Sequence, residues 1–100
     1  MTTVYVTAPA AAAQEIATAL VSEKLAACVN RVECDSTFRW EGEVVSERET
    51  VLIVKTVADR YGELESRIEE IHPYEVPCIE RFEETDRAGP FAEWVEESVR

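Results

Sequence analysis

The segment Ala26–Val57 limits the possible folds of this chain more than any other. Between Cys28 and Trp40 the even positions are mostly apolar or small and the odd positions mostly charged, which predicts a β-strand with one face suited to burial. Gly42 supplies the positive φ that a tight reversal needs, and the returning half ends in the apolar run Val51–Val54. We therefore expect one long β-hairpin with residues 40–43 at its tip.

This hairpin is too long for a compact domain of its own size. Arms of about fourteen residues at ~3.3 Å each reach roughly 46 Å, whereas a compact domain of this length has a diameter of about 34 Å. The outer half of the hairpin nevertheless carries Phe38, Trp40, Val44 and Val45, and such apolar side chains need a cover. We expect other copies of the same chain to provide it.

Composition restricts the class of protein. The chain has 100 residues, of which 46% are hydrophobic and 31% charged, as is typical of one globular domain covering residues 1–100. The net charge of −11 disfavours nucleic acids and anionic membranes as partners. No apolar run approaches a membrane span, and the first residues lack the basic region of a signal peptide. These features together predict a cytoplasmic protein.

The charge balance also predicts a salt-rich cytoplasm. The 21 acidic residues outnumber the 10 basic ones, and lysine occurs only at Lys24 and Lys55. Dense negative charge is tolerated where salt screens the mutual repulsion. This pattern favours a halophilic source over an ordinary acidic bacterial protein.

The hairpin is preceded and followed by segments with regular periods. Thr2–Ala8 alternates like a strand, and the apolar positions of Ala10–Leu25 and Ala58–Ile71 repeat as they do in amphipathic helices. Val76–Glu83 is a short last strand, expected at a sheet edge because Pro77 has no N–H for the ladder.

A C-terminal helix follows, with Phe91, Trp94 and Val95 on its apolar side. The order of elements is therefore β-α-β-β-α-β plus a helix, which predicts an α+β, ferredoxin-like fold. We expect a four-stranded antiparallel sheet with a long central β-hairpin, and both crossover helices on one face of it.

One loop concentrates side chains that could carry chemistry. His72-Pro73-Tyr74-Glu75-Val76-Pro77 places an imidazole, a phenol and a carboxylate between two prolines that fix the backbone. Such a rigid loop is suited to binding, although spacing alone favours a plainer role for His72 as a cap of the preceding helix. No phosphate-binding loop, nucleophile elbow or zinc-protease motif accompanies it. The three cysteines form no C-x-x-C pair and are expected to be reduced thiols.

Four motifs occur in a fixed order along the chain. They are Ala26-Ala27-Cys28-Val29-Asn30, Trp40-Glu41-Gly42, Lys55-Thr56 and His72-Pro73-Tyr74-Glu75-Val76-Pro77. With these four motifs, the chain resembles the CutA family, the divalent-cation tolerance proteins. The resemblance implies a ferredoxin-like fold, a tight homotrimer joined through the long hairpins, an architecture like that of PII signal-transduction proteins, and a role in tolerance of divalent metals, copper above all. Phe38, Val57 and Cys78 depart from the family pattern, in which tyrosine, a polar residue and an acidic residue are common.

Metal binding in a homotrimer is accordingly the leading hypothesis, with no cofactor required. Thiolate, imidazole and carboxylate suit copper or zinc, so the candidate ligands are Cys28, His72 and Glu75. Because Cys28 and the His72 loop fall at opposite ends of the predicted sheet, they could share a metal ion only across a subunit boundary. The residues expected to line a ligand cleft are Trp40, Lys55, Tyr74 and Cys78.

Two alternatives stay open. The first is a PII-like trimeric sensor that binds a small anionic metabolite between subunits near Lys55 and signals to a protein partner; the scarcity of basic residues argues mildly against it. The second, weaker alternative is an enzyme that uses His72 as a base oriented by Glu75. We expect the chain not to be an enzyme.

Overall fold

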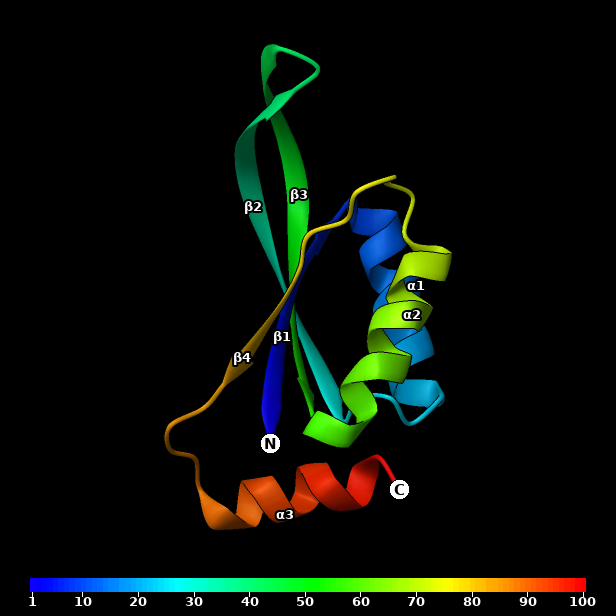
Figure 1. Ribbon diagram of the computed structural model, residues 1–100, viewed down its shortest axis with the longest axis vertical. Coiled ribbons are helices and arrows are strands. Elements are labelled where there is room, and N and C mark those ends of the chain that lie inside the picture. Colours follow the sequence, from blue (N-terminus) through cyan, green and yellow to red (C-terminus); the bar gives the residue numbers. More distant parts are fainter.

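The computed structural model describes residues 1–100 as a four-stranded antiparallel sheet with two helices against one face (Figure 1). The strands lie side by side in the order β2-β3-β1-β4. Along the chain the elements are β1 (Thr2–Ala8), α1 (Ala10–Ser22), β2 (Cys28–Trp40), β3 (Glu43–Thr56), the 3-10 turn η1 (Ala58–Arg60), α2 (Tyr61–Ile71), β4 (Ile79–Glu83) and α3 (Gly89–Ser98). The predicted ferredoxin-like fold is thereby confirmed, with α3 added after β4.

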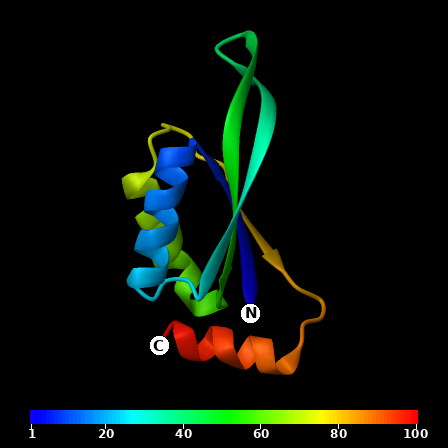
Figure 2. The ribbon, with the colours of Figure 1, turned by 180° about the vertical axis from the view of Figure 1, so that it is seen from behind.

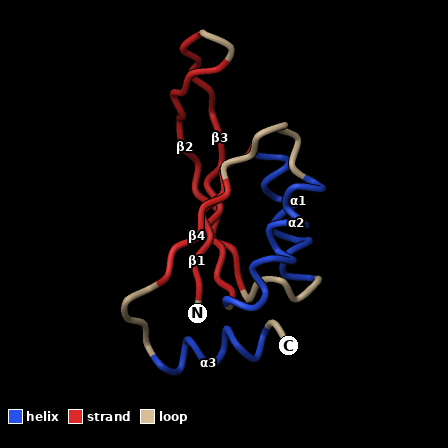
Figure 3. The backbone as a smooth tube through the Cα atoms, in the orientation of Figure 1, coloured by secondary structure: helices blue, strands red, loops and turns tan.

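The hairpin of β2 and β3 projects well beyond the rest of the molecule (Figures 1 and 3). Its pairing is uninterrupted over all 13 residues of β2. Glu41 and Gly42 make the reversal with φ of 49° and 82°, the left-handed pair that a two-residue hairpin turn requires. The molecule measures 45 × 26 × 20 Å, so the elongated shape predicted from the residue count is confirmed.

The main core lies between the sheet and helices α1 and α2 (Figure 2). Every second residue of β1, beginning with Thr2, is buried on this side. The fully enclosed large apolar side chains are Val4, Val6, Ile16, Leu20, Leu52, Val54, Leu64 and Ile68. This layer fixes α2 against β1, and it thereby positions the loop that joins α2 to β4.

The opposite face of the sheet is open, because α1 and α2 both lie on the other side (Figures 1 and 2). Residues that pair across neighbouring strands point to the same side of a sheet. The register therefore assigns Tyr5, Ile53 and Glu80 to the open face. By the same register and by alternation along the strands, all three thiols lie on the open face: Cys28, Cys34 and Cys78.

Helix α1 ends at Ser22, three residues earlier than the predicted Leu25. Lys24 adopts a left-handed φ of 60°, and the Leu25 N–H donates to the Leu20 carbonyl at 2.9 Å. This bond closes the helix as a Schellman motif. The sequence concealed the end because a lysine, instead of a glycine, takes the left-handed position.

Strand β4 lies at the sheet edge, as predicted from Pro77, but it is shorter than expected. It begins at Ile79 and not at Val76, which is 72% exposed. The reason is that Pro77 offers no N–H to the ladder, so pairing with β1 starts only after it.

Helix α3 crosses the base of the sheet and has a small core of its own (Figure 1). Val95 and Val99 are buried there against the segments that flank the hairpin. The predicted apolar side is thus only partly correct, since Phe91 and Trp94 stack on each other at the surface with ring centroids 5.7 Å apart. No helix in the structure combines the length and the apolar character needed to cross a membrane.

Candidate functional site

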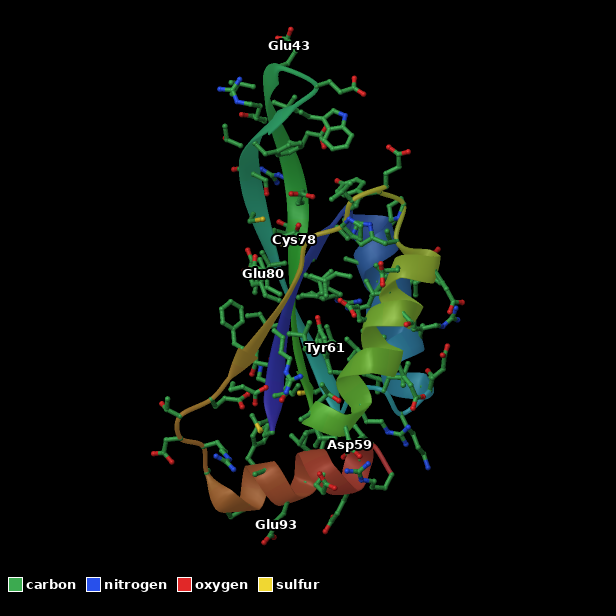
Figure 4. All side chains as sticks on the ribbon, viewed as in Figure 1. Glu43, Asp59, Tyr61, Cys78, Glu80 and Glu93 are labelled. Carbon is green, nitrogen blue, oxygen red and sulfur yellow. The ribbon has the colours of Figure 1, made fainter.

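A cleft of about 540 Å³ lies where the hairpin, the end of β1 and the loop after α2 meet. Its walls come from three paired strands and from one loop, so the sheet register fixes most of them. The lining residues are Tyr5, Thr7, Ser36, Phe38, Trp40, Glu47, Glu49, Tyr74, Glu75, Val76 and Cys78. Cys78 is labelled in Figure 4, beside the crossing of β4 and the hairpin.

His72 anchors the loop that forms one wall of the cleft. It caps α2, with its N–H donating to the Ile68 carbonyl at 2.8 Å. Its buried ring bonds at both nitrogens: Nε2 lies 2.8 Å from the Thr7 carbonyl oxygen, and Nδ1 accepts the Tyr74 N–H at 3.1 Å. An amide N–H can only donate, so the proton sits on Nε2. The imidazole therefore ties the loop to the end of β1 and has no free lone pair.

Tyr74 and Glu49 join the loop to the hairpin. The Tyr74 hydroxyl donates to Glu49 Oε2 at 3.0 Å, and Glu49 is only 5% exposed. Burial and this hydrogen bond to a carboxylate raise the pKa of Tyr74 to about 12. The phenol consequently remains a donor throughout the physiological pH range.

The cleft has a negative electrostatic character. Burial, and next the negative charge of neighbouring thiols and carboxylates, raise the pKa of Tyr5. Burial and the hydrogen bond that its thiol donates to Glu80 at 3.4 Å raise the pKa of Cys78. Three carboxylates line the cleft, and no lysine, arginine or histidine does. Such a site favours cationic ligands over anionic ones.

The structure brings together four of the seven residues predicted for a site. Trp40, Tyr74, Glu75 and Cys78 all line the cleft, while His72 lies behind its wall as an anchor of the loop.

The other two predicted residues lie elsewhere. Cys28 and Lys55 pair with each other at the far end of the hairpin stem, and Lys55 Nζ donates to Asn30 Oδ1 at 3.5 Å. As the predicted topology requires, one chain does not bring Cys28 to His72. No three side chains among its His, Cys, Asp and Glu residues are placed to hold a metal ion together.

Several lining residues were not identified from the sequence as parts of a site. Glu47 and Glu49 are the most important of them, because they supply two of the three carboxylates. They pair with Ser36 and Cys34, so counting back from the turn at Gly42 assigns them to the open face. No sequence pattern identified Tyr5 and Thr7 as lining residues, since their distance from the loop between α2 and β4 depends on how α2 packs.

Known proteins match this chain over nearly its whole length. Residues 2–98 match the CutA1 divalent ion tolerance protein family. The divalent-cation tolerance protein CutA of Thermus thermophilus is 41% identical over 88 residues, covering 87% of this chain and 85% of that protein. The crystal structure of CutA1 from Pyrococcus horikoshii is 35% identical, with a TM-score of 0.96 over 100% of this chain and 99% of that one. The PII-like protein CutA from Nostoc sp. PCC 7120 has a TM-score of 0.96 at 31% identity, over 100% and 98% of the two chains.

Proposed function

This chain belongs to the CutA1 divalent ion tolerance family, and on that premise we propose that it serves metal homeostasis as a homotrimer that binds copper or a similar cation. The observation that carries the proposal is the open face of the sheet. Apolar side chains of the hairpin on this face are left uncovered in one chain, with Val32 52% and Trp40 46% exposed. Two further copies would cover them and would bring thiols and carboxylates of different chains together.

The proposed ligands remain Cys28, His72 and Glu75, drawn from more than one subunit. Thiolate and imidazole favour copper and zinc over cations that need all-oxygen cages. For His72 to ligate, Nδ1 would have to release the Tyr74 N–H, a local rearrangement of the loop. Glu75 is exposed and needs no such change.

Assembly and metal binding can be tested together. Light scattering should give three times the chain mass of 11.3 kDa, and copper or zinc should titrate anaerobically and be removed by a chelator. Cys28→Ser should lower metal affinity, with Cys34→Ser as the matched thiol control. His72→Ala should lower it as well, provided that the variant keeps the trimer mass. If neither substitution changes the affinity, the ligands lie elsewhere; a monomer would contradict the shared site.

The second candidate function is a PII-like sensor, which the size of the cleft favours. Its 540 Å³ falls within the range of small-molecule sites, and the Nostoc relative is named a PII-like protein. Lys55 lies away from the cleft, however, so nothing there would attract an anionic metabolite. A sensor should bind its ligand in the presence of chelator, whereas metal binding should not survive it.

An enzyme with His72 as base gains no support, because both ring nitrogens are engaged in one chain.

The cytoplasmic location is also a proposal. Relatives are named a chloroplastic protein in Arabidopsis thaliana and a periplasmic one in Archaeoglobus fulgidus. Cell fractionation with an antibody would decide between the cytoplasm and another compartment. Recovery outside the cytoplasmic fraction would reject the prediction.

A further inference from the structure

The walls of the cleft combine two kinds of side chain that rarely serve a metal ion together. Four aromatic residues line it: Tyr5, Phe38, Trp40 and Tyr74. Three carboxylates, Glu47, Glu49 and Glu75, line it as well. Aromatic faces attract cations through the ring quadrupole but do not coordinate metals. The combination is therefore typical of a site for an organic cation.

The carboxylates of the cleft have no cationic partner in the chain. The arginine ion pairs of the structure all involve other acidic residues, such as Asp35 with Arg48 at 3.5 Å and Asp59 with Arg100 at 2.9 Å. Glu49 is the most informative case, because it is 5% exposed and yet only its Oε2 accepts a hydrogen bond. The other oxygen of Glu49 accepts no hydrogen bond within the chain and is not enclosed. It is therefore available to a positive group in the cleft.

We propose that this cleft binds a small alkylated ammonium ion, with its charge near Glu47 and Glu49 and its alkyl groups against Phe38 and Trp40, so that in the proposed trimer the ion and a neighbouring copy together cover these two rings. The inference rests on the sensor function proposed above and gives that function a ligand class. An inorganic cation fits less well, since no three His, Cys, Asp or Glu side chains of the chain are placed to hold it together.

The test uses choline as the probe, with its neutral carbon analogue 3,3-dimethylbutan-1-ol as the comparison. Both have the same shape, so a difference in affinity reports the charge. Calorimetry on the intact protein with chelator present should show saturable choline binding, at least about tenfold tighter than that of the neutral alcohol. Equal affinities, or no saturation up to tens of millimolar choline, would overturn the proposal.

Fluorescence locates the binding event. The chain has two tryptophans, of which Trp40 lines the cleft and Trp94 lies on α3. In a Trp94→Phe background, choline should change the emission of the remaining tryptophan with the same midpoint as the calorimetric titration. Choline binding without any change in Trp40 emission would place the ligand elsewhere.

Paired substitutions distinguish the effect of a charge in the cleft on choline affinity from the effect of the net charge of the protein. Glu47→Gln should weaken choline binding about fivefold, and Phe38→Leu should weaken it severalfold. Glu93→Gln changes the net charge equally but lies on α3 at the opposite end of the molecule from the hairpin tip (Figure 4), and it should leave the affinity unchanged. A loss with Glu93→Gln as large as with Glu47→Gln would reject the site.

The outcome is independent of the metal hypothesis. Choline binding that persists in chelator supports the ammonium site even if copper and zinc fail to bind. Conversely, metal binding through Cys28 with no choline binding would leave the metal hypothesis intact and overturn the ammonium site.

Discussion

The covered and open faces of the sheet alternate residue by residue along the same strands, but they carry different chemistry. Beneath α1 and α2 the covered face is mostly aliphatic and enclosed, as in Val4, Leu52 and Val54. The open face carries thiols, phenols and carboxylates, including Tyr5 and Glu49. One face thus stabilises the single chain, and the other holds the groups on which the proposed ligand binding and assembly depend.

The largest expected effect concerns the covered face. Leu52→Ala should lower the free energy of unfolding by about 2 to 5 kcal/mol, because it leaves a cavity under α1 and α2. Urea denaturation measures this loss. Val51→Ala, the neighbouring change on the open face, is the control and should cost clearly less in one chain. An equal loss from both would show that the two faces do not differ in packing.

The next effect concerns assembly on the open face. Val32→Asp should shift the protein from trimer to monomer, because a subunit interface would have to bury an unpaired carboxylate. Light scattering across a concentration series measures the shift. Thr18→Asp adds the same charge to the exposed side of α1 and should leave the mass unchanged. An intact Val32→Asp trimer would mean that other copies do not cover this face.

A smaller effect tests the bond between loop and hairpin. Tyr74→Phe removes the donor of Glu49 and should destabilise by about 1 to 3 kcal/mol. Tyr61→Phe, which removes a more exposed bond to Glu65, is the control. Urea denaturation at neutral pH should rank the two variants, and a greater loss from Tyr61→Phe would contradict the importance of the Tyr74 bond.

The same bond predicts a pH dependence. The pKa of Tyr74 is raised to about 12 in the folded chain, against about 10 when unfolded. Its protonated form is thus favoured by folding, so the stabilisation is complete below about pH 10 and is lost as pH rises through about 12. The difference between wild type and Tyr74→Phe should shrink over this interval, and phenolate absorbance of the wild type should show a titration near pH 12 that the Tyr74→Phe variant lacks. Ionisation of every tyrosine near pH 10 would refute the raised pKa of Tyr74.

The smallest expected effect concerns charge spread over the whole surface. Lowering the salt restores repulsion among the 21 acidic side chains and should lower the Tm by a few degrees. Melting curves in low and molar KCl measure it, with the assembly monitored in both. An unchanged Tm would argue against adaptation to high salt.

Much of the fold could be predicted because periodicity is a local property. The hairpin and its turn at Gly42 follow from alternation and one glycine, and the two crossover helices follow from their apolar spacing. The end of α1 at Lys24 was missed, since its left-handed residue is a lysine.

The candidate site could be predicted only in part, because several of its contacts join residues that are far apart in the sequence. Trp40, Tyr74 and Glu75 belong to recognisable motifs, and they do line the cleft. Glu49 belongs to no motif, and it is joined to the cleft loop only because Tyr74, 25 residues away in the sequence, donates a hydrogen bond to it. His72 attracted attention as a ligand, but its two hydrogen bonds depend on where α2 packs.

The strand order has a kinetic consequence. β1 pairs on one side with β3 and on the other with β4, so Thr2 lies opposite both Thr56 and Glu83. Contacts between residues so distant in sequence form slowly, whereas the β2–β3 hairpin closes through its own turn. On the ribosome, the first strand to emerge must therefore wait for nearly the whole chain before its second edge is paired.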